Sequence, residues 1–278
     1  MRTKSKKLLA GIGTYITLGL FAVVVLLPIL WMLSTSFKIE SETIIIPPRW
    51  IPETFTIEAY QRLWEEYPFL TYFKNSIIIV LGAVIVSVAF ACLAGYGVTR
   101  FKFKGKKGFT TFLLVTQMFP SIMLLIPYYK VLDTYGLNDS LLGMTLVYIS
   151  FTIPFCTWMM IGFFKTIPTS LDEAAIIDGC SRWKVFLKVI LPLTLPGIAS
   201  SAIYAFITVW NEYMFAQTLL ISPELKTLPL GIAELNGFYK ILWNDMMAAS
   251  VIASIPLVIL FVFMQKYFVS GLTAGAVK

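Results

Sequence analysis

Six apolar runs, each long enough to cross a lipid bilayer, divide the sequence. A transmembrane helix needs about 20 mostly apolar residues to span a hydrocarbon layer about 30 Å thick. Charged residues make up 13% of the chain, whereas soluble domains carry about 25%. We therefore expect an all-α integral membrane protein, with six transmembrane helices in a single domain over residues 1–278. The expected spans are residues 8–37, 72–99, 109–129, 141–164, 193–221 and 246–268.

Single prolines fall inside several of these runs. Neighbouring helices and hydroxyl side chains can bond the backbone carbonyls that a proline leaves free in a membrane helix. The prolines concerned are Pro28, Pro120, Pro127, Pro154 and Pro256. We expect each run to remain one span, with ends defined to within a few residues.

Basic residues are divided unequally between the two sides of the predicted membrane domain. Of the 22 Lys and Arg residues, 15 lie in the N-terminal stretch, in two connections (100–107 and 165–192) and in the C-terminal tail. Because Lys and Arg are enriched in cytoplasmic loops, we expect both termini and the 168–192 loop to be cytoplasmic. The net charge of +7 then reflects membrane topology, and no nucleic-acid partner is expected. The first run is too long for a signal peptide, and we expect it to remain as an anchor.

The polar loop at 168–192 has the pattern of a short helix followed by a bend. Ser170 and Glu173 have the spacing of a capping box, which predicts a helix beginning at Leu171. Gly179 is placed to end this helix in a left-handed conformation. The spacing of Leu171 with Ala174 and Ala175 predicts a smooth face of small residues that another protein could approach closely.

A second helix is expected after this bend, with Ser181 as its N-cap. Four apolar residues share its predicted face, namely Trp183, Phe186, Leu187 and Ile190. We expect this amphipathic helix to lie along the membrane surface, and Pro192 to turn the chain into the fifth span. An ordinary interfacial hairpin of helices would show the same pattern, so the pattern alone leaves that alternative open.

The spacing of several residues in this loop resembles a known family. Glu173-Ala174-Ala175, three residues, Gly179, nine residues and then Val189-Ile190-Leu191-Pro192 resemble the EAA loop of ABC importer permeases. Val189 stands where the family usually has isoleucine. Nearly the whole chain resembles the smaller inner-membrane permease of maltose-type carbohydrate importers. Four stretches support the wider resemblance: residues 119–129, 154–168, 210–220 and 265–278.

This resemblance implies the fold and the partners. The implied fold is the six-helix type I ABC importer permease, in a bacterial or archaeal cytoplasmic (inner) membrane. The implied partners are a second permease subunit, two ATP-binding subunits, an extracytoplasmic sugar-binding protein and a sugar, which we expect to be an oligosaccharide. In the family, the first helix of the loop docks in a cleft on the ATPase. The implied ATPase-coupling residues are Glu173, Ala174, Ala175, Asp178, Gly179 and Pro192.

Glu212 is the one carboxylate that we place inside a predicted span, and such a charge points to a functional site. With Asn211 and Tyr213 it forms a polar and aromatic cluster suited to sugar hydroxyls and ring faces. Gln117 falls near mid-membrane and faces either the pathway or a neighbouring helix. We expect these four residues to line the pathway or its gate. Packing between the two permeases is the alternative for Glu212.

Other classes of function fit the sequence less well. The chain has no histidine and no G-x-x-x-x-G-K-[ST] motif, so we expect no catalytic residue, no metal and no bound cofactor. ATP and Mg²⁺ would be used by the partner ATPase. An ion-coupled carrier would need more midplane carboxylates. The open alternative is an ABC permease of the same fold for a glycerol phosphate ester, a peptide or an amino acid.

Three further stretches carry predictions. The 38–70 loop is rich in aromatic residues and large enough to meet a docking protein, although an interfacial aromatic belt explains part of its composition. Asn244 and Asp245 precede the last run and are predicted to cap it. The 271–278 tail resembles the family's C-terminus, which implies a contact with the ATPase.

Overall fold

The computed structural model describes residues 2–237 and 241–274, and their side chains over residues 11–237 and 241–265. The described residues are mainly helical. Among them the only β-pairing is an isolated bridge between Asn236 and Ile241. The all-α fold class predicted from the sequence is confirmed.

Within residues 2–237 and 241–274, four helices are long and apolar enough to cross a membrane. They are α1 (Arg2–Ser36), α4 (Phe69–Arg100), α7 (Leu141–Thr166) and α14 (Trp243–Ala274). Pro28, Pro154 and Pro256 lie inside α1, α7 and α14, which continue through them as expected. These four helices correspond to the first, second, fourth and sixth predicted runs.

The third predicted run is broken near its middle. The helix α5 (Lys106–Thr116) is followed by a 3-10 turn, η1 (Ser121–Leu124), and by α6 (Leu125–Thr134), with a bend of 99°. Pro120 stands at this bend. The turn at the end of α5 continues to the Met118 N–H, which donates to the carbonyl of Val115 at 3.0 Å. The run is therefore not one straight helix, and its crossing of the membrane as a single span stays a prediction.

The fifth predicted run is also divided. The helix α11 (Leu195–Trp210) ends at Trp210, and α12 (Met214–Leu219) follows after a three-residue break. The residues from Arg182 to Leu193 precede α11 at a bend of 75°. If each bent pair counts as one span, the helices amount to the six that the sequence predicts.

The chain separates into two compact units. Unit 1 comprises residues 1–68 and 232–254, and contains α2 (Glu40–Thr43) and α3 (Glu58–Glu65). Its 38–68 loop is ordered by side chains. The Glu42 carboxylate accepts the backbone N–H groups of Glu53 and Thr54 at 3.1 Å each, and the rings of Phe37 and Phe55 stack at 4.6 Å.

Asn244 and Asp245 connect the start of α14 to the rest of unit 1. Arg62 of α3 donates through Nε (3.1 Å) and Nη2 (2.5 Å) to the fully buried carboxylate of Asp245. The Asn244 side chain donates to the carbonyl of Lys38 at 3.3 Å. Because α14 already begins at Trp243, both residues lie in its first turn, so the prediction that they precede and cap the helix is wrong.

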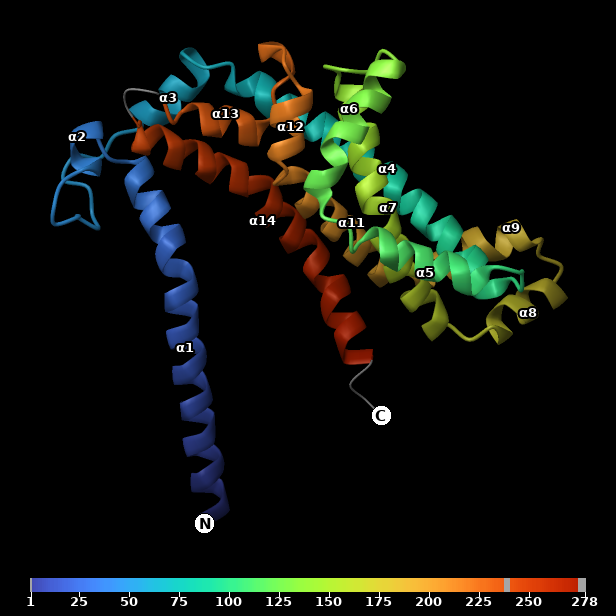
Figure 1. Ribbon diagram of the computed structural model, residues 1–278. Helices are drawn as coiled ribbons and strands as arrows, with labels where there is room; N and C mark the ends of the chain where they lie inside the picture. The colour runs from blue at the N-terminus through green and yellow to red at the C-terminus, as the bar shows by residue number, and fades with distance from the viewer. Residues whose placement is uncertain (1, 238–240, 275–278) are drawn as a thin grey trace. The chain divides into compact units, whose positions relative to one another are not determined.

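Unit 2 comprises residues 69–231 and 255–278. Its core is formed by α4 and α7, which lie side by side in Figure 1, and by α11, which packs against both. Two glycines permit the close approach. A Cβ atom at Gly95 would lie 3.0 Å from Met160 Cβ, and one at Gly197 would lie 2.5 Å from Phe163 Cγ. Small residues at helix contacts are typical of membrane proteins.

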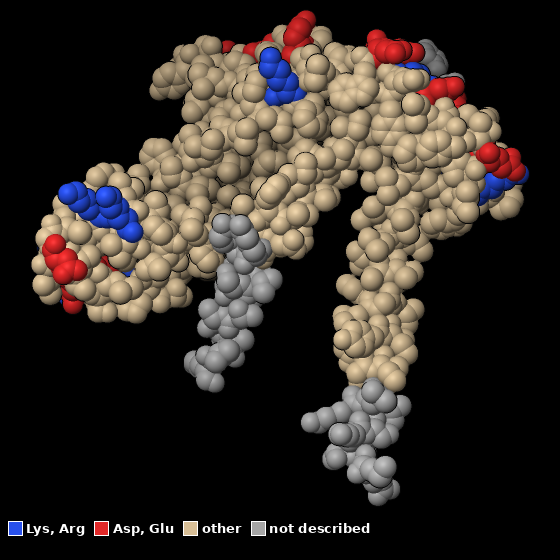
Figure 2. Space-filling model, turned by 180° about the vertical axis from the view of Figure 1, so that it is seen from behind, with Lys and Arg blue, Asp and Glu red and all other residues tan. Residues whose placement is uncertain are grey.

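The polar loop at 168–193 forms one end of unit 2 (Figure 1). It contains α8 (Ser170–Ile177), α9 (Arg182–Val185), a π-helical turn, η2 (Phe186–Ile190), and α10 (Leu191–Leu193). On the face shown in Figure 2, charged side chains gather at this end, and few interrupt the surface of the long helices. After α12 come η3 (Pro223–Leu225) and α13 (Leu228–Glu234). The Asn75 side chain of α4 holds this stretch by donating to the carbonyls of Glu224 and Lys226 at 2.8 and 3.0 Å.

Candidate functional site

The helix α8 begins without the predicted capping box. Thr169, at the N-cap position, has a helical backbone conformation and no side-chain cap hydrogen bond. In a capping box the Glu173 N–H would donate to the Ser170 hydroxyl. In this structure it donates to the carbonyl of Thr169 at 3.1 Å. The helix therefore starts at Ser170, one residue earlier than predicted.

The end of α8 follows the prediction. Gly179 has a φ of +83°, in the left-handed region that favours glycine. Its N–H donates to the carbonyl of Ile176, and the next N–H, from Cys180, donates to that of Ala175, both at 3.0 Å. These two bonds form a Schellman motif, which satisfies carbonyls at the helix end and turns the chain sharply.

One face of α8 is exposed, and the other packs against the rest of unit 2. Leu171 is 40% exposed and Ile177 is 85% exposed, and Glu173, Ala174 and Asp178 are exposed as well. Ala175 is 9% exposed and packs in an apolar cluster that contains Phe164 and Phe186. The prediction that Ala175 shares the accessible face is wrong, because this residue faces the interior of unit 2.

A buried ionic network holds the inner face of α8. Arg100 Nε, at the end of α4, lies 2.9 Å from Asp172 Oδ2, and the Tyr96 hydroxyl donates to Asp172 Oδ1 at 3.0 Å. The other nitrogens of Arg100 donate to the carbonyls of Phe164 (3.3 Å) and Ile167 (3.0 Å), at the end of α7. Asp172 also lies in the first turn of α8, where the helix dipole favours a negative charge. No spacing links the two partners, so the network could not be found from sequence.

The second half of the loop departs from a simple amphipathic helix. The Ser181 hydroxyl accepts the Lys184 N–H at 3.4 Å, so its predicted capping role is confirmed. In the π-helical turn that follows, the Leu191 N–H donates to the carbonyl of Phe186, just before Pro192, which has no N–H to give. The π-helical turn shifts the residues after it around the helix axis.

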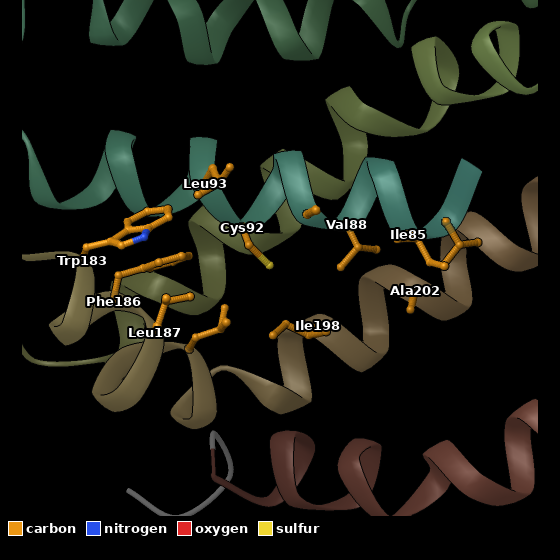
Figure 3. Close-up of a pocket in the computed structure, with 12 residues that line it drawn as sticks. Ile85, Val88, Cys92, Leu93, Trp183, Phe186, Leu187, Ile198 and Ala202 are labelled. Atoms are coloured by element: carbon orange, nitrogen blue, oxygen red, sulfur yellow. The ribbon is translucent and has the colours of Figure 1, made fainter. Parts of the chain in front are cut away.

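The four apolar residues predicted for one face of this helix therefore have two environments. Phe186 and Ile190 are buried in unit 2, whereas Trp183 is 60% exposed and Leu187 is 45% exposed. Trp183, Phe186 and Leu187 line one side of an apolar groove of about 540 Å³, and residues of α4, α10 and α11 line the rest (Figure 3). The lining side chains come from five elements of unit 2, namely α4, α9, η2, α10 and α11.

The turn into the fifth span lies after Pro192. This proline is inside α10, and the chain bends at Thr194, between α10 and α11. The Thr194 N–H donates to the carbonyls of Ile190 and Leu191, so the hydrogen-bonded turn continues past the proline. Pro196 then stands in the first turn of α11. The bend thus lies two residues after Pro192, and the role of this proline in redirecting the chain stays a prediction.

Glu212 lies in the break between α11 and α12, and both of its oxygens are occupied. Oε1 accepts the Phe215 N–H at 2.9 Å, and Oε2 accepts the Ala216 N–H at 3.2 Å and the Tyr148 hydroxyl at 2.5 Å. The carboxylate thus caps the N-terminal turn of α12 and connects it to α7. Hydrogen bonds of this kind stabilise a charge in surroundings where an unpaired carboxylate would be costly.

Glu212 and Gln117 both line a cavity of about 560 Å³ in unit 2. Gln117 directly follows α5, at the 99° bend. The cavity also contains hydroxyl groups and aromatic rings, from Tyr128, Ser150, Tyr204 and Thr208. Asn211 and Tyr213 are in the same break as Glu212 but are not among the lining residues. Asn211 donates its side-chain amide to the carbonyl of Ile207 at 2.9 Å, and Tyr213 is 37% exposed.

Comparison with known proteins settles the family. The protein-family model described as "Binding-protein-dependent transport system inner membrane component" matches residues 87–274. The chain belongs to this family. It is therefore a multi-pass permease of the inner membrane, as the sequence predicts. The predicted tail contact at 271–278 lies partly outside the described residues, which end at Ala274.

Relatives of this permease extend over nearly its whole length. The trehalose/maltose transport system permease MalG of Thermococcus litoralis is 39% identical, over 98% of this chain and 97% of its own. The diacetylchitobiose uptake system permease DasC of Streptomyces coelicolor is 37% identical, over 90% and 91%. Among solved structures, a bacterial ABC transporter that imports the acidic polysaccharide alginate has a chain 25% identical, with a TM-score of 0.81 over 93% of this chain and 96% of that one. The predicted type I importer permease fold is confirmed.

Proposed function

We propose that this permease is a subunit of an ATP-driven sugar importer. It would form the translocation pathway with a second permease subunit, receive the sugar from an extracytoplasmic sugar-binding protein, and respond to two ATP-binding subunits. The names of its relatives support a saccharide as the solute, since they include permeases for trehalose and maltose, diacetylchitobiose and maltodextrin. The MalG and DasC relatives match this chain over at least 90% of its length.

The observation that carries the proposal is the arrangement of α8. This helix has one face fixed to the ends of α4 and α7, while the opposite face presents Leu171, Ala174 and Ile177 with Glu173 beside them. A partner can grip the free face, and a rigid-body shift of the partner then reaches the membrane helices through the fixed face. We assign the free face, together with Asp178 and the Gly179 bend, to ATPase docking.

The proposal places catalysis outside this chain. ATP and Mg²⁺ would bind to the partner ATPase, and this permease would bind no cofactor and contribute no catalytic residue of its own. The excess of Lys and Arg in the N-terminal stretch and in the 100–107 and 165–192 connections supports an orientation with both termini and α8 in the cytoplasm.

The cavity at the bend after α5 is our candidate for part of the pathway. The hydroxyls of Tyr128 and Ser150 bond each other, Ser150 also donates to the carbonyl of Val147, and Thr208 donates to that of Tyr204. Their oxygens can still accept hydrogen bonds from the hydroxyls of a sugar, and the aromatic rings are suited to pack against its apolar faces. Because the oxygens of Glu212 are already bonded, we assign this residue to holding the shape of the cavity. Gln117 is the lining residue that we assign to solute contact.

Purification of the tagged chain from its native membranes in mild detergent, followed by mass spectrometry, tests the proposal. We expect a P-loop ATPase and a second permease to be recovered with it. Glu173→Arg should reduce recovery of the ATPase and leave recovery of the second permease unchanged, because α8 lies outside the lipid. Glu224→Arg, the same charge change at an exposed site in η3, is the control. Recovery of the wild-type chain alone, even after crosslinking, would refute the proposal.

A further inference from the structure

We propose that Arg100 is a positioning residue for coupling, which locks α8 to α4 and α7 so that the three helices move as one body. This inference rests on the proposed function, in which an ATPase grips the outer face of α8. It adds that the push passes through a specific buried network, and that this network can be broken while ATPase docking remains.

The geometry of Arg100 supports this role. Its guanidinium reaches three helices at once: it belongs to α4, it donates to two carbonyls at the end of α7, and it pairs with Asp172 of α8 at 2.9 Å. The carbonyls of the last helical turn have no partner inside the helix. The planar guanidinium donates to both carbonyls and at the same time holds its charge against the carboxylate, which a lysine cannot do. The contact with Asp172 is an ion pair, because the Nε–H is not aligned for a hydrogen bond to Oδ2.

Burial strengthens the attraction between Arg100 and Asp172. The Arg100 side chain is 7% exposed and the Asp172 side chain is 12% exposed, so water screens their attraction little. A charge left in such a place without its partner is strongly unfavourable. The pair therefore resists any displacement of α8 relative to the end of α4. The Tyr96 hydroxyl, one turn earlier on α4, supplies a second contact to the same carboxylate.

The apolar contacts of α8 do not by themselves fix the orientation of this helix. Of its eight residues, Asp172 and Ala175 are buried, and Ala175 has only a methyl group with which to contact the cluster around Phe164. A methyl contact can slide, whereas a bonded carboxylate keeps its position. The connection from α7 to α8 comprises only Ile167, Pro168 and Thr169, and Arg100 bonds the first of these three.

The test uses the complete transporter, with its co-purified ATPase and second permease, reconstituted in proteoliposomes. Asp172→Asn keeps the shape of the side chain and removes its charge. We expect the ATPase to co-purify and to hydrolyse ATP as in the wild type, while maltose or maltodextrin uptake per ATP falls by about tenfold, within the range of typical coupling effects. Glu224→Gln makes the same chemical change at an exposed site and should leave the ratio unchanged.

Graded variants separate positioning from simple stability. Tyr96→Phe removes the hydrogen bond to Asp172 and keeps its ion pair with Arg100, so it should lower uptake per ATP less than Asp172→Asn does. Asp172→Glu keeps the charge and should retain more coupling than Asp172→Asn. Both are mild enough to test the proposal if Arg100→Gln fails to insert.

Two outcomes would overturn the inference and leave the proposed function intact. The first is a wild-type ratio of uptake to hydrolysis in both Asp172→Asn and Arg100→Gln. The second is joint loss of ATPase recovery, hydrolysis and uptake in Asp172→Asn, which would mean that the pair only maintains the fold. Failure of the wild-type chain to recover any ATPase would instead refute the proposed function, and the inference with it.

Discussion

At the scale of single residues, Glu212 shows how this permease accommodates a carboxylate in an apolar region. The sequence marks the residue as unusual, and the structure gives the reason for its stability: two backbone N–H groups of α12 and the Tyr148 hydroxyl bond its oxygens. The break at Asn211–Tyr213 makes this possible, because it exposes the first N–H groups of α12. A carboxylate at this position thus serves as a helix cap.

Glu212→Gln should destabilise unit 2. A glutamine has one acceptor oxygen, so its NH₂ group would face at least one of the three donors, at a cost of about 1–3 kcal/mol. We expect a lower midpoint in thermal unfolding of the detergent-purified chain. Glu224→Gln, on the exposed η3, should leave the midpoint unchanged. Equal midpoints for Glu212→Gln and the wild type would show that the three hydrogen bonds contribute no net stability.

At the scale of elements, the sequence predicts helices better than it predicts their breaks. The bilayer requires apolar runs of a certain length, so the runs that became α1, α4, α7 and α14 could be recognised directly. The bends at 117–120 and at Thr194 could not be told from the positions of prolines alone, because α7 and α14 continue through Pro154 and Pro256. The close contact of Gly197 with Phe163 is an interaction that no local pattern reveals.

Gly197→Ala should weaken the packing of α11 on α7. The added Cβ would meet Phe163 at 2.5 Å, and relieving this overlap costs about 1–3 kcal/mol in a packed core. Gly162→Ala in α7 is the matched control, because a Cβ there meets nothing within 4 Å. We expect the control to be as stable as the wild type or more stable, and Gly197→Ala to unfold at a lower temperature. The opposite order would contradict the packing that we describe.

Asp139 connects the start of α7 to the chain that follows α12, and it makes this connection dependent on pH. Hydrogen bonds from the Ser222 hydroxyl and from the N–H groups of Ser222 and Ile221 lower the pKa of the Asp139 carboxyl. A carboxyl whose pKa is lower in the folded state stabilises the fold above its unfolded pKa of about 3.9. This contribution disappears as the pH falls through the folded pKa.

Asp139→Asn should therefore be less stable than the wild type at pH 7, and the difference should shrink below about pH 4. Thermal unfolding of both proteins at a series of pH values measures this. The same series for Asp133→Asn, on α6, controls for a general effect of removing a carboxylate. A difference between wild type and Asp139→Asn that does not change with pH would show that the ionised form is not what Ser222 and Ile221 bind.

At the scale of the whole molecule, the family resemblance and the distribution of basic residues lead to one topology. The sequence was sufficient to place the polar loop and the Gly179 bend, because both depend on local patterns. The sequence could not show that Ala175 faces inward or that Arg100 pairs with Asp172, because both depend on how α4, α7 and α8 come together. The sequence therefore placed α8 along the chain but could not orient its two faces, and its role in coupling stays a prediction.

Cysteine labelling in intact cells tests the topology. In a chain without Cys92, Cys156 and Cys180, Ile177→Cys places a thiol on α8 at a site that is 85% exposed. We expect a membrane-impermeant maleimide to leave this thiol unlabelled until the cells are opened. Ile46→Cys, at a site that is 91% exposed in the 38–68 loop, should be labelled in intact cells. The reverse pattern would invert the proposed orientation.

The occupied oxygens of Glu212 also bear on how long a solute would stay in the cavity at the bend. A free carboxylate in that wall would accept hydrogen bonds from two hydroxyl groups of a sugar and hold the sugar tightly. With its oxygens already bonded, the wall offers weaker, neutral partners, from which a polyhydroxylated solute can be released quickly. A passage must admit its cargo and also let it leave, so the same bonds that keep α12 in place would shorten the residence time of the cargo.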